Sequence, residues 1–119
     1  MKAARIRISN DATLKLRRIQ SKTGLTPNIL LRIGFGISLR EKTPISPSLY
    51  REDGKELNRY TITGEFDEGF VALLKEWLVR NDKTLDNKNI VSYFRAHMNR
   101  GAVLVSARIK SLTDLALLD

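Results

Sequence analysis

Two helix signals that stand almost next to each other constrain the fold of this chain most strongly. Gly24 follows a basic helical stretch and can adopt the left-handed backbone conformation that closes a helix. Thr26 and Pro27 then mark a new helix start, because threonine caps helix N-termini well and proline at the first helical position loses no needed hydrogen bond. The sequence therefore predicts two consecutive helices with almost no linker between them.

The first of these helices is predicted to be amphipathic and basic. Ala12, Leu16 and Ile19 recur at helical spacing, directly after side chains at residues 9–11 that can cap a helix start. The other faces carry Lys15, Arg17, Arg18 and Lys22. We expect about three turns of helix with one face on the core and cations on the rest.

The second helix should run to about Arg40 and is apolar over most of its circumference, so a single neighbouring surface cannot bury it. Gly34 and Gly36 each cost this helix about 1 kcal/mol relative to alanine, which is tolerable where another helix backbone approaches closely. We interpret them as packing positions, most readily at a subunit interface. The interface residues expected on this helix are Leu30, Ile33, Gly34 and Ile37.

The segment RIRIS, residues 5–9, alternates apolar and basic side chains before the first helix. A period of two predicts a short strand with Ile6 and Ile8 on one face and Arg5 and Arg7 on the other. The isoleucines are expected in a core. The arginines are expected to face an anionic ligand.

Beyond residue 40 the periodicity first weakens and then returns. A turn is expected at Asp53 and Gly54, and a short strand at residues 60–63. A helix is predicted from about Phe66 to Arg80, with Trp77 as a core anchor rather than a platform for stacking bases. The apolar stripe of this helix consists of Phe66, Phe70, Leu73, Leu74, Trp77 and Leu78.

A further helical face begins near Ile90, with an interruption expected near residues 99–101 and a last helical piece that ends at Leu118. The fold class is therefore predicted to be mainly α, with a short N-terminal strand and four to five helices. We expect one domain, residues 1–119. Residues 1–40 are its basic part and residues 41–119 are a helical extension.

The distribution of charge indicates the kind of partner. The net charge is +8, and residues 1–40 hold nine lysines and arginines against one aspartate. Residues 41–119 hold twelve groups of each sign, so the whole excess lies in the first third of the chain. Such segregation favours a polyanionic partner over an evenly solvated basic surface.

Several chemistries are disfavoured by composition. The sequence has no cysteine, so it offers no disulfide, thiolate metal site or cysteine nucleophile. Its apolar runs are far shorter than a membrane span, and we expect a cytoplasmic protein with no membrane contact. No phosphate-binding loop of the GxxxxGK[ST] type is present, and we expect no cofactor.

Catalytic and metal-binding roles are also disfavoured. Glu65, Asp67 and Glu68 stand where a helix start favours carboxylates, and only convergent geometry would make them a metal site for a nuclease. His97 is the only histidine, and a hydrogen-bonded structural role is the better interpretation. We therefore expect no metal and no enzyme.

The order strand, basic helix, Thr-Gly turn and capped helix resembles the ribbon-helix-helix module. That resemblance implies strands paired between two subunits, with Ile6 and Ile8 in their shared core and the arginines turned towards DNA. It also implies a phosphate clamp at the start of the second helix. The DNA-binding residues expected on this basis are Arg5, Arg7, Lys15, Arg17, Arg18, Lys22, Thr26 and Asn28. The sequence leaves open whether the strand pairs with another subunit or folds back on its own chain.

Longer blocks carry a more specific resemblance. KTGLTPN, LRIGF, ELNRYTITGEFD, FRAHMNRG and IKSLTDL together are similar to the E component of the Dnd DNA phosphorothioation system, over almost the whole chain. This resemblance implies a homotetrameric, non-catalytic accessory that binds duplex DNA and prefers nicked duplex. Its implied partners are the other Dnd modification proteins: a cysteine desulfurase, an iron-sulfur adenylating protein and an ATPase.

Two other functions stay open at this stage. A broad cationic surface favours contacts with the DNA backbone, whereas arginines in a major groove could read bases and make the chain a ribbon-helix-helix transcriptional regulator. A metal-dependent nicking nuclease is the less favoured alternative.

Overall fold

The computed structural model describes residues 1–109, which form five α-helices, a two-stranded antiparallel ribbon and two short 3₁₀ turns. The helices are α1 (Asn10–Thr23), α2 (Pro27–Arg40), α3 (Arg59–Thr63), α4 (Asp67–Arg80) and α5 (Asn87–Arg108). The strands are β1 (Arg5–Arg7) and β2 (Glu56–Asn58), and the 3₁₀ turns are Pro47–Leu49 and Gly64–Phe66. The predicted mainly α class is confirmed. The helical piece expected to end at Leu118 lies outside the described residues.

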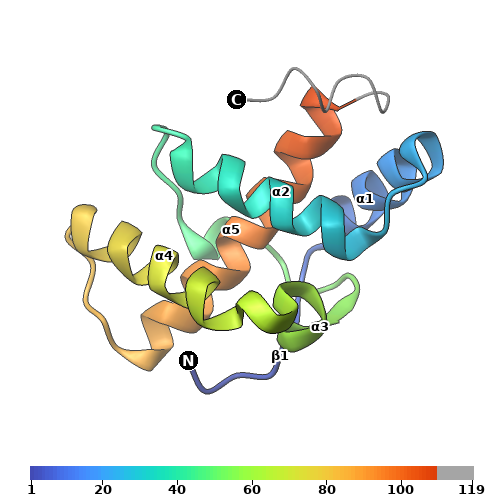
Figure 1. Cartoon of the computed structure of the whole chain (residues 1–119). Coiled ribbons are helices and arrows are strands. Elements are labelled where there is room, and N and C mark those ends of the chain that lie inside the picture. The colour runs from blue at the N-terminus through green and yellow to red at the C-terminus, as the bar shows by residue number, and fades with distance from the viewer. Residues whose placement is uncertain (110–119) are drawn as a thin grey trace.

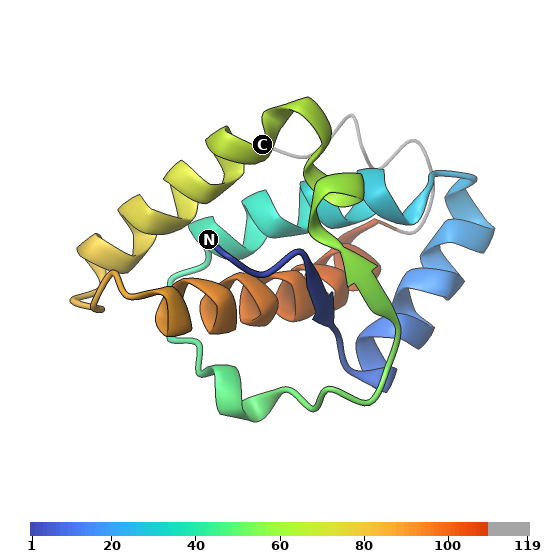
Figure 2. The same ribbon diagram turned by 90° about the horizontal axis from the view of Figure 1, so that it is seen from below.

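Helix α5 is the central element of the fold. It packs against α1, α2 and α4 (Figure 1), and from below it lies in the middle, with α1 at one end of the molecule and α4 at the other (Figure 2). All residues from 96 to 102 are buried, so this part of the helix is covered on every side. A helix that is enclosed all round is the core on which the others rest.

Two glycines let α2 and α5 cross at very short distance. A Cβ atom on Gly34 would lie 2.5 Å from the carbonyl oxygen of Gly101, and one on Gly101 would lie 2.5 Å from the carbonyl carbon of Gly34. Gly34 is thus a close-packing position, but its neighbour is a helix of the same chain. Among residues 1–109, a Cβ on Gly36 would meet nothing within 4 Å, so the packing role expected for that residue is not found in this part of the chain.

The predicted start and stop signals of α1 and α2 are confirmed. The Ser9 side chain accepts from Ala12 N at the start of α1, and Gly24 closes that helix with φ of 73°. Thr26 caps α2 by accepting from Ile29 N, with Pro27 in the first turn. The local sequence alone fixes these ends, because each depends only on residues within one turn.

The N-terminal strand folds back on its own chain. Arg5 of β1 faces Asn58 of β2, Ile6 faces Leu57, and the ribbon is antiparallel. The ribbon-helix-helix resemblance implied a partner strand from another subunit. In this structure the partner of β1 is β2 of the same chain.

Helix α5 is continuous where an interruption was expected, so that prediction was wrong. Asn99 accepts from Ser9 N at 2.8 Å and donates to the Arg95 carbonyl at 2.9 Å. Arg100 donates through Nε to the Ser38 hydroxyl at 2.8 Å and through Nη1 to the Thr43 carbonyl at 2.6 Å. The side chains of these two polar residues are buried and have hydrogen-bond partners. The helix therefore continues through them.

The segment before α4 also differs from the prediction. Residues 60–63 belong to helix α3, and the strand lies just before it, at Glu56–Asn58. Arg59, at the start of α3, is buried and donates to the carbonyls of Met1 at 2.8 Å and Ala3 at 2.9 Å. Its guanidinium also pairs with Asp67 at 3.0 Å, so one side chain ties the N-terminal segment to α4.

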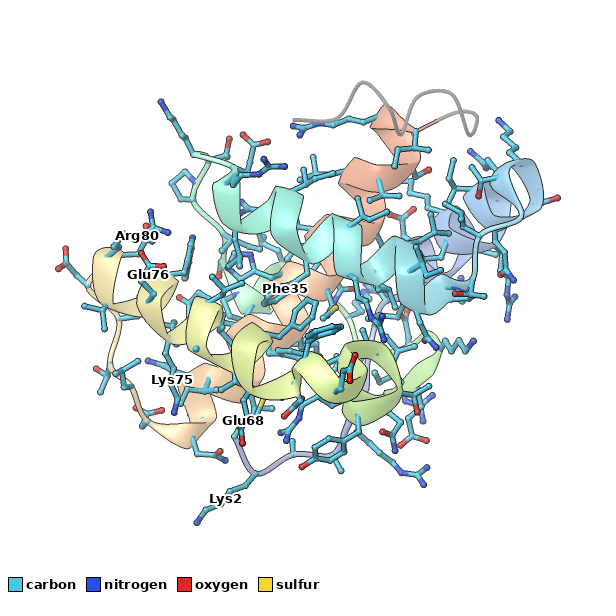
Figure 3. The ribbon with its side chains drawn as sticks, viewed as in Figure 1. Lys2, Phe35, Glu68, Lys75, Glu76 and Arg80 are labelled. Atoms are coloured by element: carbon cyan, nitrogen blue, oxygen red, sulfur yellow. The ribbon has the colours of Figure 1, made fainter. Side chains whose placement is uncertain are left out.

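Helix α4 buries only part of its predicted stripe. Trp77 is a core residue at 5% exposure, as expected, and Leu74 and Leu78 are fully buried. Phe66 and Leu73 are 58% and 52% exposed, so their predicted place in the core was wrong. Figure 3 shows the sticks of Glu76 and Arg80 on the outside of this helix and Phe35 in the interior.

Candidate nucleic-acid interface

The outward face of α1 carries the least compensated cations among the predicted DNA-binding residues. Arg17, Arg18 and Lys22 are exposed, and within residues 1–109 no carboxylate lies within ion-pair distance of them. Lys15 is half-buried and pairs with Asp11 one turn earlier at 3.0 Å. Three cations on adjacent turns therefore remain available to an anion.

The opposite face of α1 explains why these cations point outwards. Leu16 is 4% exposed and Ile19 is 2% exposed, against α2 and α5. The hydroxyl of Thr13 donates to the Ser9 carbonyl and accepts from Lys55 N at 2.9 Å. The apolar face and this hydrogen bond fix the rotation of α1.

The same hydrogen bond brings a further cation to the site. The exposed Lys55 lines a small cavity of about 80 Å³ together with Arg17, and α1, the start of α2 and β2 meet there. Lys55 was not among the predicted DNA-binding residues, because it lies in the weakly periodic segment. Its place beside α1 depends on the hydrogen bond to Thr13, 42 residues earlier, which no local pattern in the sequence marks.

Arg5 and Arg7 are exposed on the ribbon but are partly engaged by their own chain. Arg5 lies 3.6 Å from the Glu56 carboxylate, and Arg7 donates through Nη1 to the Gly54 carbonyl at 2.9 Å. Because Glu56 is the register partner of Arg7, one carboxylate stands between the two arginines. Contacts of this kind on an exposed surface are weak, and an anion can compete for both arginines.

Thr26 and Asn28 lie at the start of α2. The Thr26 side chain is already used as a cap, accepting from Ile29 N at 3.4 Å, and Asn28 is half-buried. The phosphate clamp expected here stays a prediction.

The six residues expected at an oligomer interface lie mostly within the chain's own core. Ile33 alone among them keeps partial exposure. The other five are buried, namely Ile6, Ile8, Leu30, Gly34 and Ile37. Contacts within one chain account for their burial, so their role in an oligomer stays a prediction.

The acids considered for a nuclease have a structural role at one position. Asp67 accepts from Thr63 Oγ1 at 2.7 Å and pairs with Arg59, which holds α3 against α4. Glu65 and Glu68 are exposed. Among the described residues, no three or more histidine, aspartate or glutamate side chains converge on a possible metal position.

His97 is structural, as predicted. Its Nδ1 lies 2.7 Å from the Ser38 hydroxyl, and that oxygen accepts from Arg100. Burial, and then the nearby Arg100 charge, lowers the pKa of His97 to about 3, so the imidazole is neutral at pH 7. A serine beside a histidine invites comparison with a hydrolase, but Ser38 and His97 are both at 0% exposure, and no substrate reaches them.

Arg100 shares this buried environment. Burial lowers the pKa of Arg100, whereas Tyr50 and Glu41 oppose that shift. Burial likewise raises the pKa of Tyr50. These groups hold the loop after α2 in place and do not line the α1 face.

The described residues define a small helical protein that presents a cationic helix, steadied by a ribbon, on one end of a closed core. No described helix is both long and apolar enough to cross a membrane. The chain belongs to the DndE family, described as DNA sulphur modification protein DndE, which matches residues 5–113.

Solved structures agree with this assignment. The crystal structure of DndE from Escherichia coli B7A, involved in DNA phosphorothioation modification, matches with 26% identity and a TM-score of 0.72. The match covers 92% of this chain and all of the other. A double glycine-to-lysine mutant of DndE matches with 25% identity and a TM-score of 0.70, over 88% of this chain and 99% of that one. No curated protein sequence matches this chain.

Proposed function

We propose that this chain is a non-catalytic DNA-binding accessory of phosphorothioate modification, and that it holds duplex DNA, preferably nicked, on the α1 face. The observation that carries the proposal is the set of three exposed cations, Arg17, Arg18 and Lys22, without carboxylate partners among residues 1–109. Membership of the DndE family supplies the context of DNA sulphur modification.

The geometry favours recognition of the DNA backbone over recognition of bases. The cations extend from the surface of one helix into solvent, and Arg5 and Arg7 have alternative partners within the chain. Long side chains without fixed orientation bind phosphates well, whereas bases are read by side chains held in a defined geometry. Binding should therefore depend weakly on sequence and strongly on salt.

The proposal includes partners. The sequence has no cysteine, so sulfur transfer is assigned to other Dnd proteins. A homotetramer in the cytoplasm would repeat the α1 face and increase avidity for one duplex. The mass of the protein with and without nicked duplex, measured by light scattering, tests this assembly and its ligand together.

The decisive experiment is an anisotropy titration of labelled intact and nicked duplexes at several salt concentrations. Arg17→Ala combined with Arg18→Ala should weaken binding to every sequence alike and lower the salt slope by about 0.9 for each lost phosphate contact. Lys75→Ala combined with Lys88→Ala removes the same charge from exposed positions elsewhere and should change the slope much less. Equal effects of both double variants would refute the proposed face.

The same titration separates the alternatives. A single palindromic duplex bound orders of magnitude more tightly than random DNA would indicate a transcriptional regulator. Relaxation of supercoiled plasmid with Mg²⁺ or Mn²⁺, abolished by Glu65→Ala, would indicate a nuclease. We expect neither result, and a modest preference for nicked over intact duplex.

A further inference from the structure

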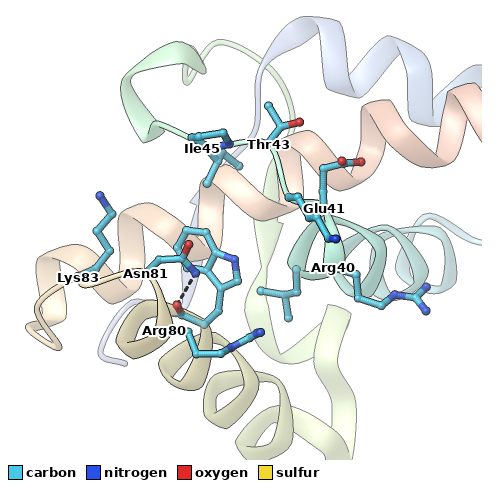
Figure 4. A pocket seen from close by; sticks show the side chains of 11 residues that line it. Arg40, Glu41, Thr43, Ile45, Arg80, Asn81 and Lys83 are labelled. Carbon is cyan, nitrogen blue, oxygen red and sulfur yellow. Dashed lines mark hydrogen bonds between the residues drawn. The ribbon is translucent and has the colours of Figure 1, made fainter.

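A hollow lies away from α1, where the C-terminal ends of α2 and α4 meet (Figure 4). It has a volume of about 660 Å³. Its lining combines four cationic side chains, Arg40, Lys42, Arg80 and Lys83, with apolar ones that include Leu39, Pro44, Ile45 and Trp77. A neighbouring hollow of about 440 Å³ shares Arg40, Glu41 and Lys42 with it, and we treat the two adjoining hollows as one groove. We call it the α2/α4 groove.

The cations of this groove are mostly uncompensated. Arg40, Lys42 and Lys83 are exposed, and within residues 1–109 no carboxylate pairs with them. Arg80 pairs with Glu76 at 3.2 Å on the helix surface. The only acid in the lining, Glu41, pairs with Arg108 at 2.9 Å. The groove therefore presents positive charge to solvent.

These cations are not needed to satisfy the helix ends. Glu41 N donates to the carbonyls of Ile37 and Ser38 and so closes α2. Asn81 does the same for α4, donating from its backbone and its side chain to the Trp77 carbonyl. Because these terminal carbonyls already have donors, Arg40, Lys42 and Lys83 are available to an external anion, with no carboxylate partner among residues 1–109.

The groove is also rigidly held. The loop between α2 and the first 3₁₀ turn is fixed by Arg100, which donates to the Ser38 and Thr43 carbonyls from inside the core. Trp77 is 5% exposed and packs edge-to-face with His97 at 4.4 Å between ring centroids. A preformed site loses less conformational entropy on binding.

We propose that the α2/α4 groove binds an acidic peptide segment of a partner protein, with glutamate or aspartate on the cations and one apolar side chain over Ile45 and Pro44. Two adjoining hollows suit a peptide whose side chains occupy both, and their positive charge complements an acidic peptide. A duplex carries its phosphates on the outside and its bases stacked inside, so a duplex bound here would contact the cations and leave the apolar floor empty. The α1 face and this groove then contact different partners at opposite ends of the molecule.

The test uses a fluorescein-labelled ten-residue peptide of glutamates around a central leucine and phenylalanine, and the same peptide with glutamine for glutamate. The acidic peptide should bind the full chain, and the glutamine peptide should bind much more weakly. Trp77 is the only tryptophan, so unlabelled acidic peptide should also change the intrinsic emission of the protein.

Paired charge variants locate the binding. Lys42→Gln combined with Lys83→Gln should weaken peptide binding about fivefold and leave duplex binding nearly unchanged. Arg17→Gln combined with Arg18→Gln removes the same charge on α1. This variant should weaken duplex binding and leave peptide binding nearly unchanged. These exposed positions are not part of the core, so both variants should fold, which circular dichroism confirms.

Three results would overturn the proposal. Equal loss of peptide affinity in both double variants would mean attraction to net charge alone. Equal binding of the glutamine peptide would mean that the cations are not used. Loss of duplex binding in the groove variant, together with displacement of the peptide by duplex, would make the groove a nucleic-acid site. Failure here leaves the function of the α1 face untouched, since that rests on the duplex titration.

Discussion

Replacing Gly101 with alanine should destabilise this protein through a clash that side-chain movement cannot relieve. The new Cβ would lie 2.5 Å from the Gly34 carbonyl carbon and 2.8 Å from Phe35 N, both backbone atoms of α2. Helices α2 and α5 would have to separate by about 1 Å, and a gap of this size forfeits a quarter to a half of each dispersion contact across it.

The expected magnitude follows from two opposing effects. Overpacking of a close helix crossing costs about 3 kcal/mol, whereas alanine gains about 1 kcal/mol over glycine in helix propensity. The free energy of unfolding should therefore fall by about 2 kcal/mol, and the melting temperature by about 8 °C for a domain of this size. Gly34→Ala should behave alike because the contact is mutual.

Gly36→Ala is the matched control. It lies on the same helix as Gly34, and its Cβ would meet nothing within 4 Å, so it should keep or raise stability by up to about 1 kcal/mol. Urea denaturation followed by circular dichroism at one fixed protein concentration measures all three variants. Equal stability of the Gly101→Ala and Gly36→Ala variants would refute the close crossing.

Three further outcomes are expected. The folded-state pKa of His97, about 3, lies below the unfolded value of 6.5, so its contribution to stability is full above pH 6.5 and lost as pH falls towards 3. Unfolding free energy should drop by about 2 kcal/mol between pH 7 and pH 5, and His97→Gln should remove that drop, as denaturation at both pH values would show. Ser9→Ala should lower the free energy of unfolding by about 1 kcal/mol, because it removes the N-cap of α1. Ser21→Ala, on the exposed side of α1, should leave that free energy almost unchanged in the same assay. Asp67→Asn should cost about 3 kcal/mol in thermal unfolding, because it leaves the buried Arg59 charge uncompensated; wild-type stability would contradict the ion pair.

The parts of the fold that sequence predicted well are those with local causes. The ends of α1 and α2 were predicted because Ser9, Gly24 and Thr26 act within one turn of helix. Trp77 and His97 were assigned to the interior from their place on a helical face, and both are buried. The excess of charge on the first forty residues likewise pointed to α1, where Arg17, Arg18 and Lys22 have no carboxylate partner among the described residues.

The errors have long-range causes. Asn99 and Arg100 look like a helix end, and only their partners at Ser9, Ser38 and Thr43, far away in sequence, make them interior residues. The pairing of β1 with β2 and the approach of Lys55 to α1 are long-range for the same reason. No periodicity within a window of residues carries information about such contacts.

The same long-range pattern applies to Gly34, which was correctly selected as a place of close approach. The sequence could not say whether the approaching backbone belonged to another subunit or to residues much further along the chain. It belongs to Gly101.

The central position of α5 has a consequence for synthesis. Helix α1 rests on α5, and Ser9 N donates to Asn99, so the support for the cationic helix is the last described element to leave the ribosome. A nascent chain that ends before residue 87 has the arginines of α1 but nothing to hold them in their folded arrangement. Polyanions in the cell therefore meet an ordered cationic face only after residues 87–108 have been translated.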